Sequence, residues 1–309
     1  MMERGVVLDC ARKVYSSDFI FRLLDVMELT HFTHLQLHFS DNEGYRIESD
    51  VCPELVSADH FTKAEILEFQ RYAKQKQITI IPELDSPGHL QHFLRVYPQF
   101  RLDESIKCAA DITDPRFVAH IKSLITEVLT LFSDSPVFHL GCDEVIDWDR
   151  VAYLPSRVQT CLSATNQVDY INDLAEVVEQ KGKRARIWND GCYRKKTENR
   201  LKSSIEIAYW TRWHKEMAPV DTFLEHHHPL FNYNDNDLYF VLGEAAGYTY
   251  PSVEKLRDFT PAKFAQQQWD TTHRSKGFYF SIWGDHPEAL DEDMILTKIT
   301  PLLTELATK

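Results

Sequence analysis

The chain has 309 residues, of which 43% are hydrophobic and 26% charged, and a formal net charge of −13. This composition is typical of a globular protein, and no apolar stretch reaches the roughly 18 residues that predict a membrane span. The negative charge argues against nucleic acid, because a phosphate backbone needs a basic surface, but it fits a neutral substrate. We therefore expect neither a nucleic-acid nor a membrane partner.

The N-terminal stretch MMERGVVLDC lacks the basic start and the apolar core of a signal peptide, which predicts a cytoplasmic protein. The six cysteines contain no CxxC pair, and Cys10, Cys142 and Cys192 lie at or beside predicted strand ends. We expect free buried thiols, as in a reducing compartment, and neither a disulfide framework nor a zinc site.

Short apolar runs alternate with segments of helical period along the chain. The predicted strands are 6–11, 34–40, 79–85, 137–144, 185–190, 205–210, 229–233 and 277–285. The predicted helices are 18–29, 62–76, 115–131, 168–181, 219–226, pieces between 252 and 269, and 290–306. Eight units that begin with a strand favour an α/β fold, a single (β/α)8 TIM barrel over residues 1–309. A doubly wound sheet would usually carry a glycine-rich turn after its first strand, and none is present.

Polar and aromatic residues collect where the predicted strands stop. In chain order they are Arg12, Asp41, Glu83, Asp85, His89, Asp143, Glu144, Trp188, Asp190, Trp210, Tyr233, Asp235, Trp283 and Asp285. The longest non-helical insertions also follow strands, at 41–61, 86–113, 145–165 and 232–251. One acid after a strand is more often a helix cap, and one tryptophan is more often core. Eight strand ends with this composition indicate one pocket at the barrel mouth.

The residue types in this predicted pocket indicate a neutral carbohydrate ligand. Carboxylates and an arginine bind hydroxyl groups in pairs, and tryptophan rings pack on the apolar faces of sugars. Phosphate would require more cations and backbone nests.

The stretch FHLGCDEV, residues 138–145, places Asp143 and Glu144 side by side at a strand end. A glycosidase needs one carboxylic acid that is protonated near neutral pH, and negative charge to offset the developing cation. An ionised Asp143 and a partly apolar setting would raise the pKa of Glu144. Neighbouring side chains of a strand point to opposite faces, so the chain must turn here for both carboxyls to reach one pocket.

Several motifs together resemble glycoside hydrolase family 20, the β-N-acetylhexosaminidases. They are LDCAR, RIESD after HFSDNEGY, IPELDSPGH, FHLGCDE and SIWGD, in that order from residue 8 to residue 285. The resemblance implies a (β/α)8 catalytic domain that removes terminal β-linked GlcNAc or GalNAc from oligosaccharides, with no cofactor and no metal. It also implies substrate-assisted retaining catalysis, in which the sugar's own 2-acetamido oxygen attacks the anomeric carbon.

Residue roles follow from the resemblance, position by position. Glu144 would be the acid and then the base, while Asp143 would orient the acetamide and stabilise the oxazolinium-like intermediate. The implied substrate-binding residues are Arg12 and Asp285 at the outer hydroxyls, Asp41 and His89 beside the catalytic pair, Trp188, Trp210 and Trp283 as aromatic walls, and Tyr233 and Asp235 at the acetamide.

The chain also departs from many members of this family. Those members carry a separate α+β domain before the barrel and a secretion signal, and many have Glu where Asp285 stands. The further tryptophan that some relatives use on the leaving-group side could correspond to Trp213 or Trp148. Sugar preference, linkage and oligomeric state, including a homodimer, stay open.

Three alternative functions stay open beside this one. A disaccharide-releasing enzyme of the same family, similar to lacto-N-biosidase, would differ in whether the pocket is closed behind the ring. A metal-dependent barrel hydrolase would use histidines such as His34, His38, His89 and His139, but the typical HxH pair at a strand end is missing. A non-catalytic sugar-binding barrel usually lacks the acid, whereas both acids are present here.

Overall fold

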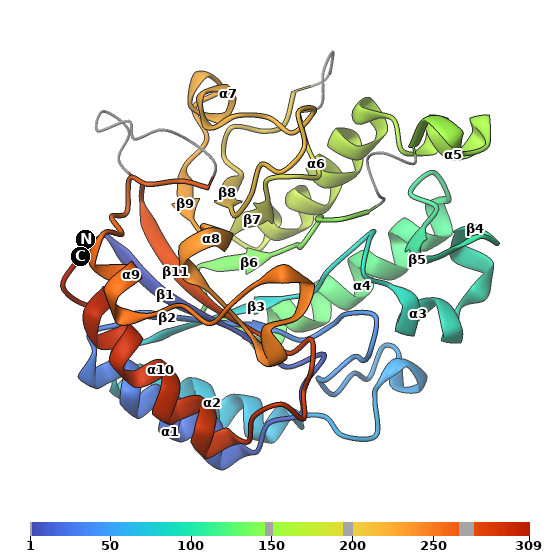
Figure 1. Cartoon of the computed structure of the whole chain (residues 1–309). Coiled ribbons are helices and arrows are strands. Elements are labelled where there is room, and N and C mark those ends of the chain that lie inside the picture. The colour runs from blue at the N-terminus through green and yellow to red at the C-terminus, as the bar shows by residue number, and fades with distance from the viewer. Residues whose placement is uncertain (1, 146–150, 194–199, 266–274) are drawn as a thin grey trace.

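The computed structural model describes residues 2–145, 151–193, 200–265 and 275–309. Eight parallel strands form a barrel with helices outside it (Figure 1). They are β1 (Glu3–Asp9), β2 (His34–His38), β3 (Thr79–Glu83), β6 (Val137–His139), β7 (Arg184–Trp188), β8 (Glu206–Tyr209), β9 (Leu230–Asn232) and β11 (Gly277–Trp283). Strand β1 pairs with both β2 and β11, which closes the barrel. All eight strands overlap the predicted ranges, so the predicted TIM barrel is confirmed.

The longer helices cover the outside of the barrel and begin at side-chain caps. They are α1 (Ser17–Leu29), α2 (Lys63–Gln75), α4 (Pro115–Leu131), α6 (Ala164–Gln180) and α10 (Glu292–Leu306). The hydroxyl of Thr62 caps α2 in a capping box with Glu65, and Asp114 caps α4 just before Pro115. Helices α1, α2 and α10 lie side by side on one flank, near the adjacent chain termini (Figure 1).

Short elements in the loops build the rim at the carboxyl ends of the strands. The loop after β2 holds η1 (Pro53–Leu55), and the loop after β3 holds α3 (Gln91–Val96), η2 (Pro98–Phe100) and the antiparallel pair β4 (Arg101–Asp103) and β5 (Ile106–Ala110). Later loops hold η3 (Val151–Tyr153), α5 (Ser156–Cys161), α7 (Val220–Glu225), α8 (Asp235–Leu238), η4 (Leu242–Gly247) and α9 (Val253–Arg257).

The seventh strand differs from its prediction because it is interrupted. Strand β9 ends at Asn232, α8 follows, and the chain then forms β10 (Tyr239–Val241). Strand β11 pairs with β9 at its start and with β10 at its end, both in parallel. The interruption brings Tyr239 to the barrel mouth, where the sequence predicted a loop.

A polar network fills the barrel interior below the rim. Glu83 is completely buried and accepts hydrogen bonds from Gln36 Nε2 at 2.7 Å and from Trp188 Nε1 at 2.8 Å. Arg186, equally buried, donates to Glu206 at 2.7 Å. Opposite charges and hydrogen bonds offset the desolvation of these groups. The network supports the rim residues from below.

Two further expectations concern thiols and membranes. All six cysteines are free thiols, and all except Cys108 are buried, as expected. Among the described residues, no helix is both long and apolar enough to cross a membrane.

Candidate active site

A cleft of about 380 Å³ lies at the carboxyl ends of the barrel strands. Nine of the eleven predicted site residues line it, namely Arg12, Asp41, His89, Asp143, Glu144, Trp210, Asp235, Trp283 and Asp285. Trp213 also lines this cleft and is 45% exposed. Trp148, the other tryptophan considered for the leaving-group side, lies outside the described residues.

The other two predicted residues, Trp188 and Tyr233, lie beneath the cleft and do not line it. Trp188 is 1% exposed and its indole nitrogen is bound to Glu83. The hydroxyl of Tyr233 is buried between Gln36 and Arg186, at 2.8 and 3.1 Å. Both side chains belong to the interior network, because a residue at the end of a strand can point into the barrel as well as toward its mouth.

Residues 141–145 follow β6 and have an unusual backbone, and we name them the catalytic turn after the roles predicted for Asp143 and Glu144. Gly141, Cys142 and Glu144 have φ of 70°, 76° and 41°, which are left-handed values. The chain therefore turns, and Asp143 and Glu144 both reach the cleft, as their roles require. A Cβ atom on Gly141 would lie 1.9 Å from Oδ1 of Asp85, so only glycine fits at that position.

Two aspartates from neighbouring loops hold this turn in place. The backbone N–H of Cys142 donates to Asp85 Oδ1 at 2.9 Å, and the N–H of Glu144 donates to Asp190 Oδ2 at 2.8 Å. The other oxygen of Asp190 accepts a hydrogen bond from Trp210 Nε1 at 2.9 Å. Burial and the charge of Asp143 raise the pKa of Asp190 to about 7.

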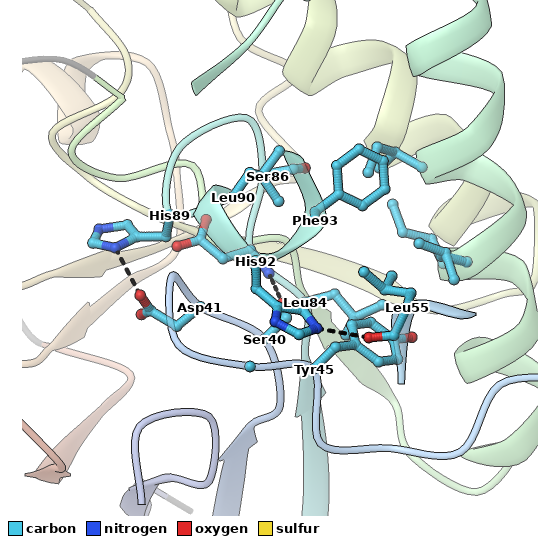
Figure 2. Close-up of a pocket in the computed structure, with 15 residues that line it drawn as sticks. Ser40, Asp41, Tyr45, Leu55, Leu84, Ser86, His89, Leu90, His92 and Phe93 are labelled. Carbon is cyan, nitrogen blue, oxygen red and sulfur yellow. Dashed lines mark hydrogen bonds and ion pairs between the residues drawn. The ribbon is translucent and has the colours of Figure 1, made fainter. Parts of the chain in front are cut away.

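Asp41 lies at the centre of a charged group on the opposite side of the turn. Its carboxylate contacts Arg12 at 2.7 Å, His38 at 2.9 Å and His89 at 3.2 Å. Figure 2 shows the pair of Asp41 and His89. Both residues line a small cavity of about 20 Å³, which could hold a water molecule but no sugar. Burial alone would raise the pKa of Asp41, but His89 and Arg12 hold it well below its usual value.

His89 connects this group to the catalytic turn. Its Nε2 lies 3.5 Å from both Asp143 Oδ2 and Glu144 Oε2. Burial would lower the pKa of His89, but the carboxylates of Asp41 and Asp143 raise it well above its usual value. The three carboxyl groups around His89 therefore favour its imidazolium form.

The pKa of Glu144 corrects one expectation. Burial raises this pKa, but the hydrogen bond and the charge of His89 outweigh it, so the net shift is downward. The side chain is 47% exposed, so solvent screens the effect. The pKa of Asp143 is raised instead, by burial and by Glu144, although His89 opposes the shift. The expected rise for Glu144 did not account for the imidazolium from a separate loop.

Aromatic rings form the other wall of the cleft. The rings of Trp210 and Tyr239 are parallel within 1°, with centroids 5.9 Å apart, and the Tyr239 and Trp283 centroids lie 5.7 Å apart. Asp235 closes this side and accepts hydrogen bonds from Thr211 Oγ1 at 2.9 Å and from the Tyr248 hydroxyl at 3.2 Å. This wall provides an apolar surface beside hydrogen-bonding groups, as a ligand with a methyl group and an amide requires.

The sequence reasoning missed His38, Tyr239 and Tyr248 as cleft residues. The apolar run LYFVL, which begins three residues after Asp235, was a usable signal for a further strand carrying Tyr239. Tyr248 lies in an irregular loop, where periodicity gives no indication of direction.

Comparison with known proteins identifies the family. The profile described as glycosyl hydrolase family 20, catalytic domain, matches residues 3–301. The chain belongs to glycosyl hydrolase family 20. The resemblance seen in the strand-end motifs is thus confirmed, and with it the assignment to a family of β-hexosaminidase enzymes.

Two curated relatives and one solved structure show the extent of the likeness. The family 20 chain is 29% identical over 220 residues to the lacto-N-biosidase of Bifidobacterium bifidum, covering 67% of this chain and 19% of that protein. It is 28% identical over 258 residues to the beta-hexosaminidase subunit A2 of Dictyostelium discoideum, covering 79% and 43%. The chain therefore spans less than half the length of either relative. The crystal structure of dispersin B matches 100% of this chain and 99% of its own, with a TM-score of 0.83 and 25% identity.

Proposed function

We propose that this chain hydrolyses terminal β-linked N-acetylhexosamine from oligosaccharides. One observation carries the proposal: Asp143 and Glu144 face the same cleft as the aromatic wall of Trp210, Tyr239 and Trp283. Relatives that bear the name beta-hexosaminidase support it. The cleft combines a proton donor, a second carboxyl group and an apolar wall for an acetyl methyl group.

In the first step, the acetamido oxygen of the substrate attacks the anomeric carbon. Glu144 gives its proton to the glycosidic oxygen, which leaves as an alcohol when the C–O bond breaks. Asp143 accepts a hydrogen bond from the acetamide N–H and offsets the positive charge of the oxazolinium ring. In the second step, Glu144 takes a proton from water, and the hydroxyl attacks the anomeric carbon and opens that ring with net retention.

His89 stabilises Glu144 after the proton has left. The imidazolium lies 3.5 Å from Glu144 Oε2, so the carboxylate forms next to a positive charge. Asp41 in turn holds His89 through Nδ1 at 3.2 Å. The same charge lowers the pKa of Glu144, so its protonated form is favoured at acidic pH. We therefore expect an acidic optimum for the reaction.

Tyr239 supports the acetamide in place of the predicted Tyr233. It lines the cleft between Trp210 and Trp283, whereas Tyr233 lies in the interior network. Burial and nearby acids, including Asp143, raise the pKa of Tyr239 well above its usual value, so it stays a neutral donor. In this proposal its hydroxyl donates to the acetamide oxygen.

One observation favours a second candidate, the release of a disaccharide. Asp285 is exposed at the end of the cleft that Arg12 occupies, and the side chain of Glu43, 3.7 Å from Arg12, is 53% exposed. This end of the cleft is open to solvent, so a second sugar could extend beyond the ring that is cleaved. The lacto-N-biosidase relative agrees with this alternative.

Two nitrophenyl substrates test both candidates. We expect nitrophenol release from the N-acetyl-β-glucosaminide, at a rate that a chelator leaves unchanged. No release from this substrate, but release from the nitrophenyl glycoside of galactosyl-N-acetylglucosamine, would replace the first candidate with the second. Activity that disappears with chelator would support a metal-dependent hydrolase, and no turnover of either substrate would support a sugar-binding barrel.

A further inference from the structure

Asp85, beneath the catalytic turn, and Asp143, within the turn, each have one carboxyl oxygen that is shielded from water. Asp85 is 3% exposed, and its Oδ1 accepts the N–H of Cys142. Its second oxygen, Oδ2, and Oδ1 of Asp143 are both inaccessible to water and have no hydrogen-bond partner among the described residues. One oxygen from each carboxyl group and one ring nitrogen of His89 lie within 4.8 Å of one another.

Two ionised carboxylates in this position would repel each other without a compensating donor. The backbone nevertheless brings them together, because Gly141 has no Cβ atom that would collide with Asp85. A single proton on one carboxyl group turns the repulsion into a hydrogen bond. Such a hydrogen bond would give each of the two unpartnered oxygens a partner.

The surroundings decide which carboxyl group carries the proton. Burial and the charge of Asp143 raise the pKa of Asp85 well above its usual value, although His89 and His38 oppose the shift. Burial also raises the pKa of Asp143, but the charge of His89 opposes that shift. The other titratable groups that face Asp85 are His38 on β2, Glu83 on β3, Cys142 in the catalytic turn and Tyr170 on α6. The proton therefore belongs on Asp85.

We propose that Asp85 is a positioning residue, a neutral carboxylic acid whose Oδ2 donates its proton to Asp143 Oδ1. The hydrogen bond fixes the rotation of the Asp143 carboxylate, and that carboxylate keeps its negative charge for the substrate. Asp85 itself touches no substrate. The inference rests on the proposed function, because that function gives Asp143 its role.

A divalent cation between Asp85, His89 and Asp143 is the competing explanation for the unpartnered oxygens. His89 argues against it in its protonated form, which the neighbouring carboxylates of Asp41 and Asp143 favour. An imidazolium ion has no lone pair to offer a metal. The cation is tested below as an alternative outcome.

Amide substitutions at two aspartates give a matched kinetic test. In Asp85→Asn, the amide NH₂ can donate to Asp143 and the amide oxygen can accept from Cys142, so the variant reproduces the neutral acid. Both oxygens of Asp190 accept hydrogen bonds from N–H donors, so Asp190→Asn places NH₂ against a donor. We expect kcat to fall less than about tenfold in Asp85→Asn, and by about 100-fold in both Asp85→Ala and Asp190→Asn.

Two further measurements complete this test. They are the change of kcat relative to the change of KM, and the circular dichroism of each variant, which reports whether it is folded. We expect KM to change little in Asp85→Ala, because the residue acts through Asp143, and circular dichroism should show a folded protein. An Asp85→Asn variant as inactive as Asp85→Ala would overturn the proposal, since it would mean that Asp85 acts as an ion.

Infrared difference spectroscopy tests the proton without any substrate. At neutral pH, a protonated carboxyl band should persist in Asp190→Asn, which removes the carboxyl group whose pKa is raised to about 7, and should disappear when Asp85→Asn is added to that variant. Absence of that band from Asp190→Asn would overturn the proposal, whether or not the chain hydrolyses sugars. A band that a chelator changes and zinc restores would support the cation and overturn the proposal too. If the band is present but no N-acetylhexosaminide is cleaved, the proposed function fails and the carboxyl pair stands.

Discussion

Arg186 in the barrel interior and Asp143 in the catalytic turn are charged groups in opposite surroundings. Arg186 donates to Glu206 at 2.7 Å and to the Tyr233 hydroxyl at 3.1 Å, so opposite charge and hydrogen bonds compensate its burial. Asp143 faces other acids and has His89 as its cation. A buried charged group with an oppositely charged, hydrogen-bonded partner keeps its protonation state. An acid that is surrounded by other acids gains and loses its proton more easily. We therefore expect the interior network to serve structure and the turn to serve chemistry.

The largest effect should come from Glu144 in the catalytic turn. Glu144→Gln should lower turnover of an unactivated oligosaccharide by roughly 10²–10⁴-fold, because the general acid is lost. The melting temperature should change little, since the side chain is half exposed. Kinetics and thermal unfolding measure both, with the exposed Glu288→Gln as the control. Near-normal turnover would contradict the role of Glu144.

A mutation in the interior network should lower the stability of the folded protein. Arg186→Met removes the buried cation that pairs with Glu206 Oε2 and leaves only the half-exposed Arg184 at Oε1 among the described contacts, and we expect the free energy of unfolding to fall by about 3–5 kcal/mol. Urea unfolding measures this loss. An equally stable variant would mean that the interior charges are not structural.

Comparing Gly141 in the catalytic turn with Gly182 separates the energetic cost of backbone strain from the cost of a steric clash. Gly141 and Gly182 have nearly the same φ, 70° and 71°, but an added Cβ meets Asp85 at Gly141 and nothing within 4 Å at Gly182. Gly182→Ala should cost about 1–2 kcal/mol, the cost of a left-handed residue with a side chain. Gly141→Ala should cost more and also reduce activity. Equal losses of stability would show that the approach of Asp85 is not tight.

The smallest effect concerns pH. The charge of His89 lowers the pKa of Glu144, so removal of that charge in His89→Asn should raise this pKa. Because the acid must be protonated, the high-pH limb of kcat/KM should move to higher pH, by about one unit or 1.4 kcal/mol. A pH profile of both proteins measures the shift. A limb that stays in place or moves to lower pH would contradict the account of His89.

Much of the barrel could be predicted from the sequence, because each strand is a short apolar run followed by polar residues. The interruption between β9 and β10 was not predicted, because a three-residue strand has no periodicity to detect and the apolar run LYFVL was its one signal. The cleft followed from the rule that barrel strands end at one rim. Trp188 and Tyr233 were predicted to line the cleft but lie beneath it. Their position at a strand end does not determine whether a side chain points toward the barrel mouth or into the barrel interior. The pKa of Glu144 depends on His89 from a distant loop, which no local pattern shows.

The central claim is that the 2-acetamido group of the substrate takes part in the reaction within this one cleft. Its most direct test compares kcat/KM for a nitrophenyl N-acetyl-β-glucosaminide with that for the matched β-glucoside, which has a hydroxyl in place of the acetamide. The account predicts that the first substrate is hydrolysed and the second barely reacts. Equal rates on the two substrates would contradict it.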